Sequence, residues 1–255
     1  MSLLKTVLKL AAPAPKIEDY SRFLFIGPHP DDIEIGAGAT AAKLAAAGKE
    51  VCFLICIDGR YGDGAAPCKG EELIALRRSE AVKSAEMLGV KDVRFLGLCD
   101  GGFYEQKVLE DAVAKVIGEF KPQVIFAPDP CVTSECHADH LNVGNAARKL
   151  ACFAPYGGIM ANYGAEAAPV EALAYYMTAK ANRFVGTKGF LQKQSEAIFK
   201  CHLSQFPAGC ADADAIGLYL KLRAYDFGLR SLHATAEGFR VLGVTQMHCF
   251  PEAGE

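Results

Sequence analysis

The stretch Ile26-Gly27-Pro28-His29-Pro30-Asp31-Asp32-Ile33-Glu34 decides how this chain is organised. It directly follows the apolar run Phe23–Ile26, which has the composition of a buried β-strand. The glycine and the prolines are expected to prevent a helix from starting there, so the stretch is predicted to be a loop. Loops at the carboxyl ends of strands are where open α/β sheets bind ligands. We therefore interpret His29, Asp31 and Asp32 as half of a metal site.

The other half is expected in His137-Ala138-Asp139-His140, the second place where histidines cluster. This cluster follows the predicted loop Pro128–His137, which comes after another apolar run at Gln123–Ala127. The carboxyl ends of parallel strands meet at one edge of a sheet, so two clusters far apart in the sequence are expected to share one ion.

The chain alternates apolar strand-like runs with helix-like segments joined by short connections, a pattern typical of βαβ units. We predict a Rossmann-like three-layer α/β fold with a mostly parallel sheet and ligand loops at the carboxyl ends of strands 1 and 4. The predicted strands are 22–27, 49–57, 93–98, 123–127, 172–178 and 239–245, and the predicted helices are 37–47, 71–88, 108–120, 190–204 and 211–227. Residues 1–255 are expected to form a single domain, with a core at 17–150 and an elaboration at 151–255.

The composition of the chain argues against nucleic acid and membranes as partners. The 255 residues carry a net charge of −3 without a basic run, so nucleic acid is not an expected partner. No segment has the length needed to cross a bilayer, so no membrane partner is expected. The apolar stretch Leu3–Ala12 is interrupted by Lys5 and Lys9. It is predicted to be a short amphipathic helix that packs on the domain or a neighbouring subunit, rather than a signal peptide.

The ten cysteines contain no CxxC pair, and several lie in apolar strands. A chain of this size does not need disulfides for stability, so we interpret them as buried free thiols in a reducing, cytoplasmic setting. Cys131 and Cys136 lie beside the second histidine cluster and have no predicted role.

Zinc in hydrolases typically keeps three protein ligands and leaves one position for water. His29, Asp32 and His140 offer two imidazoles and one carboxylate, which suit zinc better than calcium or magnesium and also accept iron or cobalt. A bound cation lowers the pKa of its water toward neutrality. Asp31, next to Asp32 in the same loop, is the expected general base.

His137 lies three residues before His140 and need not bind the metal. It is expected to stabilise the oxyanion or to pass a proton to the leaving group. Asp139 is expected to hold the His137 imidazole through a hydrogen bond.

Other interpretations of these residues stay open. Paired aspartates after a strand can simply cap a helix. Gly36-Ala37-Gly38 partly matches a dinucleotide loop, although the acidic cluster before it is unsuited to phosphate. Asp31 and Asp32 could also be a glycosidase pair, but adjacent loop carboxylates rarely face each other across a sugar bond at the needed separation.

Pro28–Gly36 together with His137–His140 resembles the LmbE/PIG-L family of zinc-dependent N-deacetylases. The resemblance covers most of the chain and continues through Leu76–Ala81, Gly89–Val90, Asp100–Gly101, Lys193–Ala197, Ser204–Phe206 and Ala236–Phe239. It implies the zinc ligands His29, Asp32 and His140, the general base Asp31, and His137 as electrophile or acid.

The resemblance also implies that Arg77 and Asp100 help hold the sugar or its aglycone. An N-acetylglucosamine-type substrate and a homo-oligomer, a trimer or hexamer, are likewise implied. Departures from the family pattern at Ala37, in the long loop before His137 and at Val185–Thr187 bear on which substrate is used and leave the metal ligands untouched.

The leading hypothesis is a metal-dependent hydrolase that removes an N-acetyl group through a zinc-activated water. An amidase acting on a larger conjugate is an alternative with the same metal chemistry. A metal- or nucleotide-binding module without turnover is the alternative from another functional class.

Overall fold

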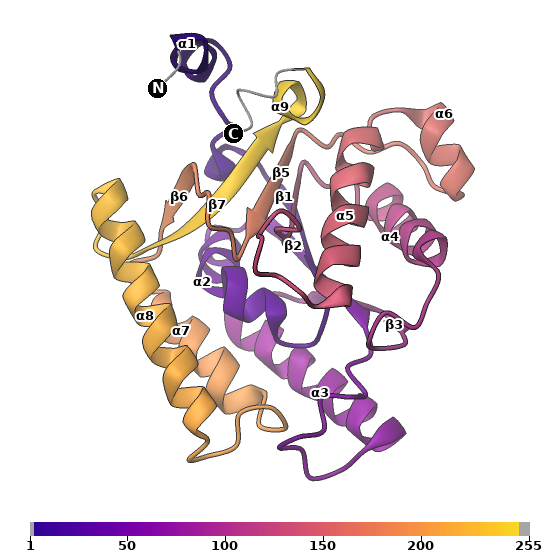
Figure 1. Ribbon diagram of the computed structural model, residues 1–255, viewed down its shortest axis with the longest axis vertical. Helices are drawn as coiled ribbons and strands as arrows, with labels where there is room; N and C mark the ends of the chain where they lie inside the picture. Colours follow the sequence, from indigo (N-terminus) through magenta and orange to yellow (C-terminus); the bar gives the residue numbers. More distant parts are fainter. Residues whose placement is uncertain (1–2, 250–255) are drawn as a thin grey trace.

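The computed structural model describes residues 3–249 (Figure 1). Within that range, seven strands form one sheet in the order β3-β2-β1-β4-β5-β7-β6. Their bounds are β1 Arg22–Gly27, β2 Glu50–Ile57, β3 Asp92–Leu98, β4 Val124–Pro128, β5 Ala172–Tyr176, β6 Arg183–Gly186 and β7 Ala236–Gly243. Neighbours among β1 to β5 are parallel, whereas β7 runs antiparallel to both β5 and β6. The predicted mostly parallel α/β sheet is confirmed.

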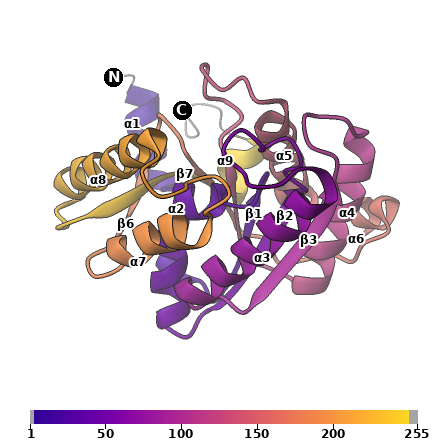
Figure 2. The same ribbon diagram turned by 90° about the horizontal axis from the view of Figure 1, so that it is seen from below.

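Helices cover both faces of the sheet, as the two views show (Figures 1 and 2). The helices are α1 Leu3–Ala11, α2 Asp32–Ala46, α3 Gly70–Leu88, α4 Gln106–Phe120, α5 Ala138–Phe153, α6 Gly157–Met160, α7 Leu191–Glu196, α8 Ala211–Ser231 and α9 Val244–His248. Short 3₁₀ turns lie at Ile17–Asp19 and Ala161–Tyr163, and a π-helical turn extends α7 over Ala197–Cys201. Three layers result, with α4 and α5 on one face of the parallel strands and α2 and α3 on the other.

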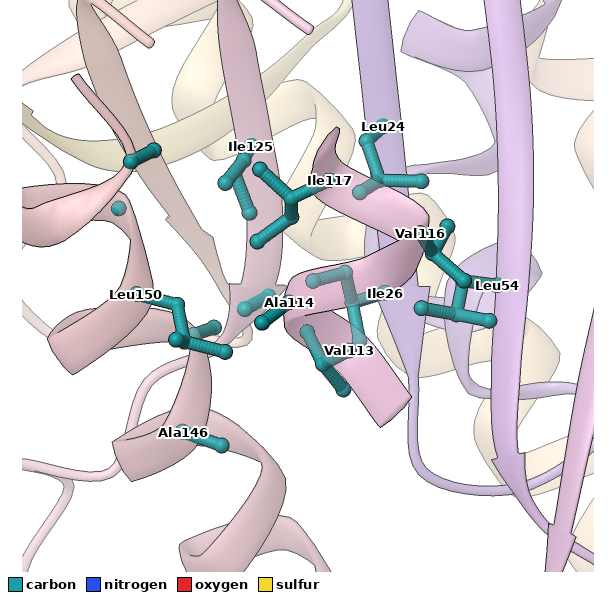
Figure 3. Packing of buried hydrophobic residues seen from close by; sticks show 14 of the residues in the cluster. Leu24, Ile26, Leu54, Val113, Ala114, Val116, Ile117, Ile125, Ala146 and Leu150 are labelled. Carbon is teal, nitrogen blue, oxygen red and sulfur yellow. The ribbon is translucent and has the colours of Figure 1, made fainter. Parts of the chain in front are cut away.

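The side chains of β1 alternate between two buried cores, as a strand covered on both faces requires. Leu24 and Ile26 pack against α4 and α5 (Figure 3). Phe23 and Phe25 enter the core beneath α2 and α3, where Phe25 stacks on Phe126 with ring centroids 4.1 Å apart. Each of these fully buried side chains contributes about 1.5–3 kcal/mol relative to an exposed one.

The pairing of β1 with β4 places the two predicted ligand loops next to each other. Phe23 is in register with Val124 and Phe25 with Phe126, so the two strands run side by side toward the same edge. β2 and β3 end at this edge too, which brings Asp58 and Asp100 there. The topology therefore gathers four loops at one edge of the sheet.

The prediction that a loop extends through Glu34 is wrong. α2 begins at Asp32, directly after Pro30 and Asp31, because a proline just before a helix does not prevent its first turn. The Asp32 side chain accepts a hydrogen bond from the His29 backbone N–H at 2.8 Å, which stabilises this entry. The predicted helix start at Ala37 instead coincides with a kink, since Ala37 has non-helical backbone angles of φ −153° and ψ 16°.

Long-range partners support the kinked α2. Glu237 on β7 accepts hydrogen bonds from the backbone N–H groups of Ala39 and Thr40, which follow the kink. Gln194 on α7 donates to the carbonyl oxygen of Glu34, which precedes it. Gly36 must be glycine, because a Cβ atom there would lie 2.2 Å from the Tyr176 ring.

The C-terminal predictions were less accurate. The predicted helix 190–204 is the short α7 followed by the π-helical turn, and the last strand is displaced to Ala236–Gly243. β6 was missed because its four residues carry too short a pattern to distinguish from a loop. The predicted helix 211–227 continues to Ser231.

The N-terminal segment forms the predicted helix α1, but most of its described apolar side chains are exposed. Leu3 and Leu10 are about four-fifths exposed. Packing against a neighbouring subunit stays a prediction. Among the described residues, no helix is both long enough and apolar enough to span a membrane.

All ten cysteines are free thiols in the structure. The expectation that they are buried holds for Cys52, Cys56 and Cys201, whereas Cys131 and Cys136 are exposed. Exposure follows from their place in the loop between β4 and α5.

Candidate metal centre

The turn after β1 has a strained backbone and is held in place by a side chain from α3. Asp31 has φ 129°, a backbone conformation that costs a non-glycine residue about 1–3 kcal/mol. The buried guanidinium of Arg77 on α3 donates to the Pro30 carbonyl at 3.0 Å and to Asp31 Oδ2 at 3.2 Å. Its other amino group donates to the carbonyl of Gly59 at 2.9 Å. Arg77 thus fixes the turn that carries the acidic pair.

The structure brings together His29, Asp32 and His140. Asp32 Oδ2 lies 3.2 Å from His29 Nδ1 and 3.4 Å from His140 Nε2. One ligand atom from each residue lies within 4.8 Å of the others, so a single ion could contact all three. Both predicted clusters therefore meet at the end of β1 and at the start of α5.

Carboxylates orient both imidazoles through the ring nitrogens that face away from Asp32. His29 Nε2 lies 3.2 Å from Asp100 Oδ1 and 3.3 Å from Asp139 Oδ2. His140 Nδ1 lies 3.0 Å from Glu135 Oε2. Such outer carboxylates are common around histidines that bind metal, because they fix the ring and raise its basicity.

Asp139 is fully buried and is held by three donors. The backbone N–H groups of Gly101 and Gly102 and the hydroxyl of Tyr104 donate to its carboxylate at 2.8–3.0 Å. Although burial works against the charge, the bonds to His29 and these donors keep the pKa of Asp139 below its usual range. Its carboxylate lies 3.7 Å from His137 Nδ1. Asp139 therefore contacts His29 more closely than the expected partner His137.

The electrostatics of this cluster favour a cation. Burial lowers the pKa of His29, but hydrogen bonds to three carboxylates outweigh it and raise the pKa to about 12. Burial also lowers the pKa of His140, but the hydrogen bond to Asp32 and the negative charge of Asp32 outweigh this effect and raise the pKa to about 9. The excess of carboxylates thus favours positive charge at the imidazoles. The two imidazoles and one carboxylate suit a zinc ion, which would supply this charge while the rings stay neutral.

Asp31 and His137 lie on the rim of the cluster, where both line a cavity of about 360 Å³. Burial raises the pKa of Asp31 to about 6, against the effect of the Arg77 guanidinium. His137 is the N-cap of α5 and half exposed, with its ring centroid 4.8 Å from that of His29. Its Nδ1 accepts a hydrogen bond from the Asp139 backbone N–H, so a neutral ring carries its proton on Nε2.

A protein-family model matches about half of the chain. The profile of the PIG-L family, described as GlcNAc-PI de-N-acetylase, matches residues 24–151, a span that includes both histidine clusters. The chain belongs to the PIG-L family.

Other members of the PIG-L family match over most of the chain. Diacetylchitobiose deacetylase of Thermococcus kodakarensis is 31% identical over 238 residues, which cover 92% of this chain and 88% of that protein. 1D-myo-inositol 2-acetamido-2-deoxy-alpha-D-glucopyranoside deacetylase of Thermomonospora curvata is 31% identical over 207 residues, which cover 70% and 67%. The structure of N,N'-diacetylchitobiose deacetylase from Pyrococcus horikoshii superposes with a TM-score of 0.84 at 29% identity, covering 98% of this chain and 97% of that one.

Arg77 and Asp100, the substrate contacts that the PIG-L resemblance implies, both line the cavity. Each also bonds to the protein. Arg77 clamps the turn after β1, and Asp100 accepts a hydrogen bond from the Tyr61 backbone N–H at 3.2 Å. A role for either in substrate binding stays a prediction.

Sequence reasoning missed three residues of this PIG-L site. Glu135 orients His140, while Tyr61 and Gln205 line the cavity. The glycine-rich loop Asp58–Gly64 signalled Tyr61 only through its place after a strand. Gln205 lies in Ser204–Phe206, a segment that carries the family resemblance but was interpreted as structural. It reaches the site from beyond α7 and donates to the Gly62 carbonyl at 2.8 Å.

Proposed function

We propose that this chain is a metal-dependent hydrolase that removes the acetyl group from an N-acetylglucosamine-type sugar. The observation that carries the proposal is the group His29, Asp32 and His140, beside which Asp31 and His137 open into one cavity. The substrate class is supported by the names of the relatives, which describe deacetylases of acetylated glucosamine compounds.

The metal is proposed to be zinc, held by His29, Asp32 and His140. A zinc ion there would supply Lewis acidity, lowering the pKa of water and polarising the amide carbonyl. The donor set also accepts iron or cobalt, so metal analysis decides which ion the protein contains.

The roles of the neighbouring side chains follow from their positions. The Asp31 carboxylate takes one proton from the attacking water, whose oxygen forms a bond to the acetyl carbon. In its protonated form His137 donates a hydrogen bond from Nε2 to the developing oxyanion and passes that proton to the departing nitrogen as the C–N bond breaks. The proton that Asp31 took from water then returns His137 to its protonated form. Each cleaved amide consumes one water, and the products are acetate and a free amine.

The cavity has a volume of about 360 Å³, at the small end of ligand sites, and it can hold one acetylated sugar ring. It is open to solvent, so its volume does not exclude a longer acyl group. The names of the relatives, which are deacetylases, favour an N-acetyl substrate over the larger conjugate that an amidase would cleave.

The decisive experiment compares the zinc-loaded wild type with Asp31→Asn on a panel of N-acetylglucosaminides. The wild type is expected to release acetate. The variant should lose about 10²–10⁴-fold in rate while it binds the same amount of zinc. Asparagine tolerates positive φ well, so the strained turn should survive.

Asp63→Asn is the matched control, because Asp63 is a carboxylate in the neighbouring loop that pairs with Lys69. It should leave the rate unchanged. Absence of acetate release from the whole panel would refute the proposed reaction. An Asp31→Asn variant as fast as the wild type would refute the assigned base. Zinc binding without acetate release in the wild type and in both variants would indicate a binding module.

We further propose that the protein acts as one domain within a homo-oligomer, a trimer or hexamer, in the cytoplasm. The free cysteines support a reducing setting, and the single sheet that joins residues before and after 150 supports one domain.

A further inference from the structure

Helix α8 has two apolar faces, but only one of them packs on the domain. Leu220, Ala224 and Phe227 are buried against the rest of the domain. On the opposite face lie Leu218, Leu222, Tyr225 and Leu229, and Leu232 follows the last turn; these five side chains are 51–95% exposed. We call them the α8 stripe. Figure 1 shows α8 at the outer side of the molecule, beside the β7–β6 end of the sheet.

The spacing of the α8 stripe is regular. Its members follow one another after four, three, four and three residues, which is the 3.5-residue repeat of a seam between two helices. Scattered single apolar residues on a surface need no explanation, but a continuous exposed stripe marks an interaction site. A helix that packs only on its own domain needs the inner face and not this second one.

Charged and polar residues beside the stripe indicate what covers it. In the heptad that this spacing defines, Leu222 and Leu229 occupy a, so Lys221 occupies g and Asp226 occupies e. In a parallel helix pair, a g residue faces the e residue five positions later on the other helix. Lys221 would therefore face Asp226 of a second α8, and the reciprocal pair would form by symmetry.

The next pair along the seam fits as well. Asp214 at g would face Tyr219 at e of the second copy, so a carboxylate would accept from a phenol hydroxyl. All four of these residues are exposed, and Asp226 lies 3.6 Å from Arg230 of its own helix. An antiparallel pair would instead join g to g, where Lys221 could meet Asp214, and e to e, where Asp226 would meet no lysine or arginine. The charges thus favour a parallel pairing of α8 with itself.

We propose that the α8 stripe is a contact surface between copies of this chain, in which neighbouring α8 helices run parallel around a rotation axis. Each copy supplies the same patch, so the contact is closed and symmetric. Two-fold and three-fold axes both permit this geometry, and the measured mass gives the number of copies. The inference concerns assembly and does not depend on the proposed reaction.

The first test measures the mass of the full chain by sedimentation over a range of concentrations. The wild type is expected to be an oligomer. The double variant Leu222→Glu with Leu229→Glu should dissociate at least tenfold more readily, because two carboxylates would be buried at the seam. Val108→Glu is the matched control, since Val108 is an exposed apolar residue on α4 and should leave the mass unchanged.

The second test exchanges the charges. Lys221→Asp and Asp226→Lys should each weaken association several-fold, and the variant that carries both should recover it, because the pair is restored with its signs reversed. A monomeric wild type, or an oligomer that the Leu222 and Leu229 changes leave intact, would overturn the proposal. Loss of association in the stripe variants without recovery in the charge exchange would overturn the parallel orientation.

Discussion

The parallel and the antiparallel parts of the sheet contribute differently to the site. Among the described residues, the candidate ligands and their neighbouring acid–base groups all come from the parallel part, before the end of α5. The antiparallel strands and the helices around them contribute buried polar side chains that hold α2, the helix whose first turn carries Asp32. The candidate ligand and acid–base residues therefore form two short clusters in the sequence, whereas the residues that support them are scattered.

Support from the C-terminal part reaches the ligand turn through buried hydrogen bonds. His202 Nε2 lies 3.2 Å from Glu34 Oε1, to which the Ser84 hydroxyl, on α3 in the parallel part, also donates at 2.5 Å. Glu34 is two residues beyond Asp32, so this contact fixes the first turn of α2 from beneath. The comparison predicts that changes in the parallel part abolish activity without unfolding the chain, and that changes in the antiparallel part do the reverse.

The largest effect is expected for His140→Ala. It removes one of three ligands, so activity should fall by at least about 10³-fold and bound metal should fall with it. His140 is partly exposed, so the fold should remain intact. Metal content, acetate release and near-ultraviolet circular dichroism measure the three consequences. A variant that keeps both metal and rate would show that His140 is not a ligand.

This division explains how much the sequence could predict. The parallel strands and the two histidine clusters were predictable because long apolar runs and local ligand spacings are visible within a few residues. The role of Glu237 was not, because its acceptor contacts with Ala39 and Thr40 span almost two hundred positions, as the separations of 198 and 197 show. The start of α2 was misplaced because the prolines favour a loop, whereas the hydrogen bond from the His29 backbone N–H to the Asp32 carboxylate, which favours the helix start, is visible only in the folded turn.

A second test of the comparison is Glu237→Ala. It leaves the backbone N–H groups of Ala39 and Thr40 without acceptors, and each such buried group costs about 1–3 kcal/mol, so the free energy of unfolding should fall by roughly 3 kcal/mol. Urea unfolding measures the change, and Glu86→Ala on the exposed side of α3 is the control. The rate per folded molecule should stay within a few-fold of the wild type. A stable variant with strongly reduced activity would contradict the supporting role.

The pH dependence of this stability change has a definite sign. Burial raises the pKa of Glu237 from 4.5 to about 7, against the hydrogen bonds from Thr40 and Ala39. Between these values the folded chain keeps a proton that the unfolded chain has released. The stability that Glu237 contributes is therefore greatest below pH 4.5 and declines as the pH rises to about 7. The difference between wild type and Glu237→Ala should shrink accordingly across that range.

The smallest effect is expected for Glu135→Gln, which tests whether support inside the parallel part acts on the metal. Glu135 accepts from the His137 backbone N–H through Oε1 and orients His140 through Oε2. An amide can replace only one of these two acceptors, and it removes the negative charge. Zinc affinity should fall by about 10–100-fold, as measured by competition with a chelator. Saturating zinc should return the rate to near the wild-type value, which separates this role from that of a ligand such as His140.

Glu119→Gln is the control, because Glu119 is an exposed partner of Arg94, and it should leave the zinc affinity unchanged. Unchanged affinity in Glu135→Gln would mean that His140 needs no outer carboxylate and that the metal is held by its three ligands alone.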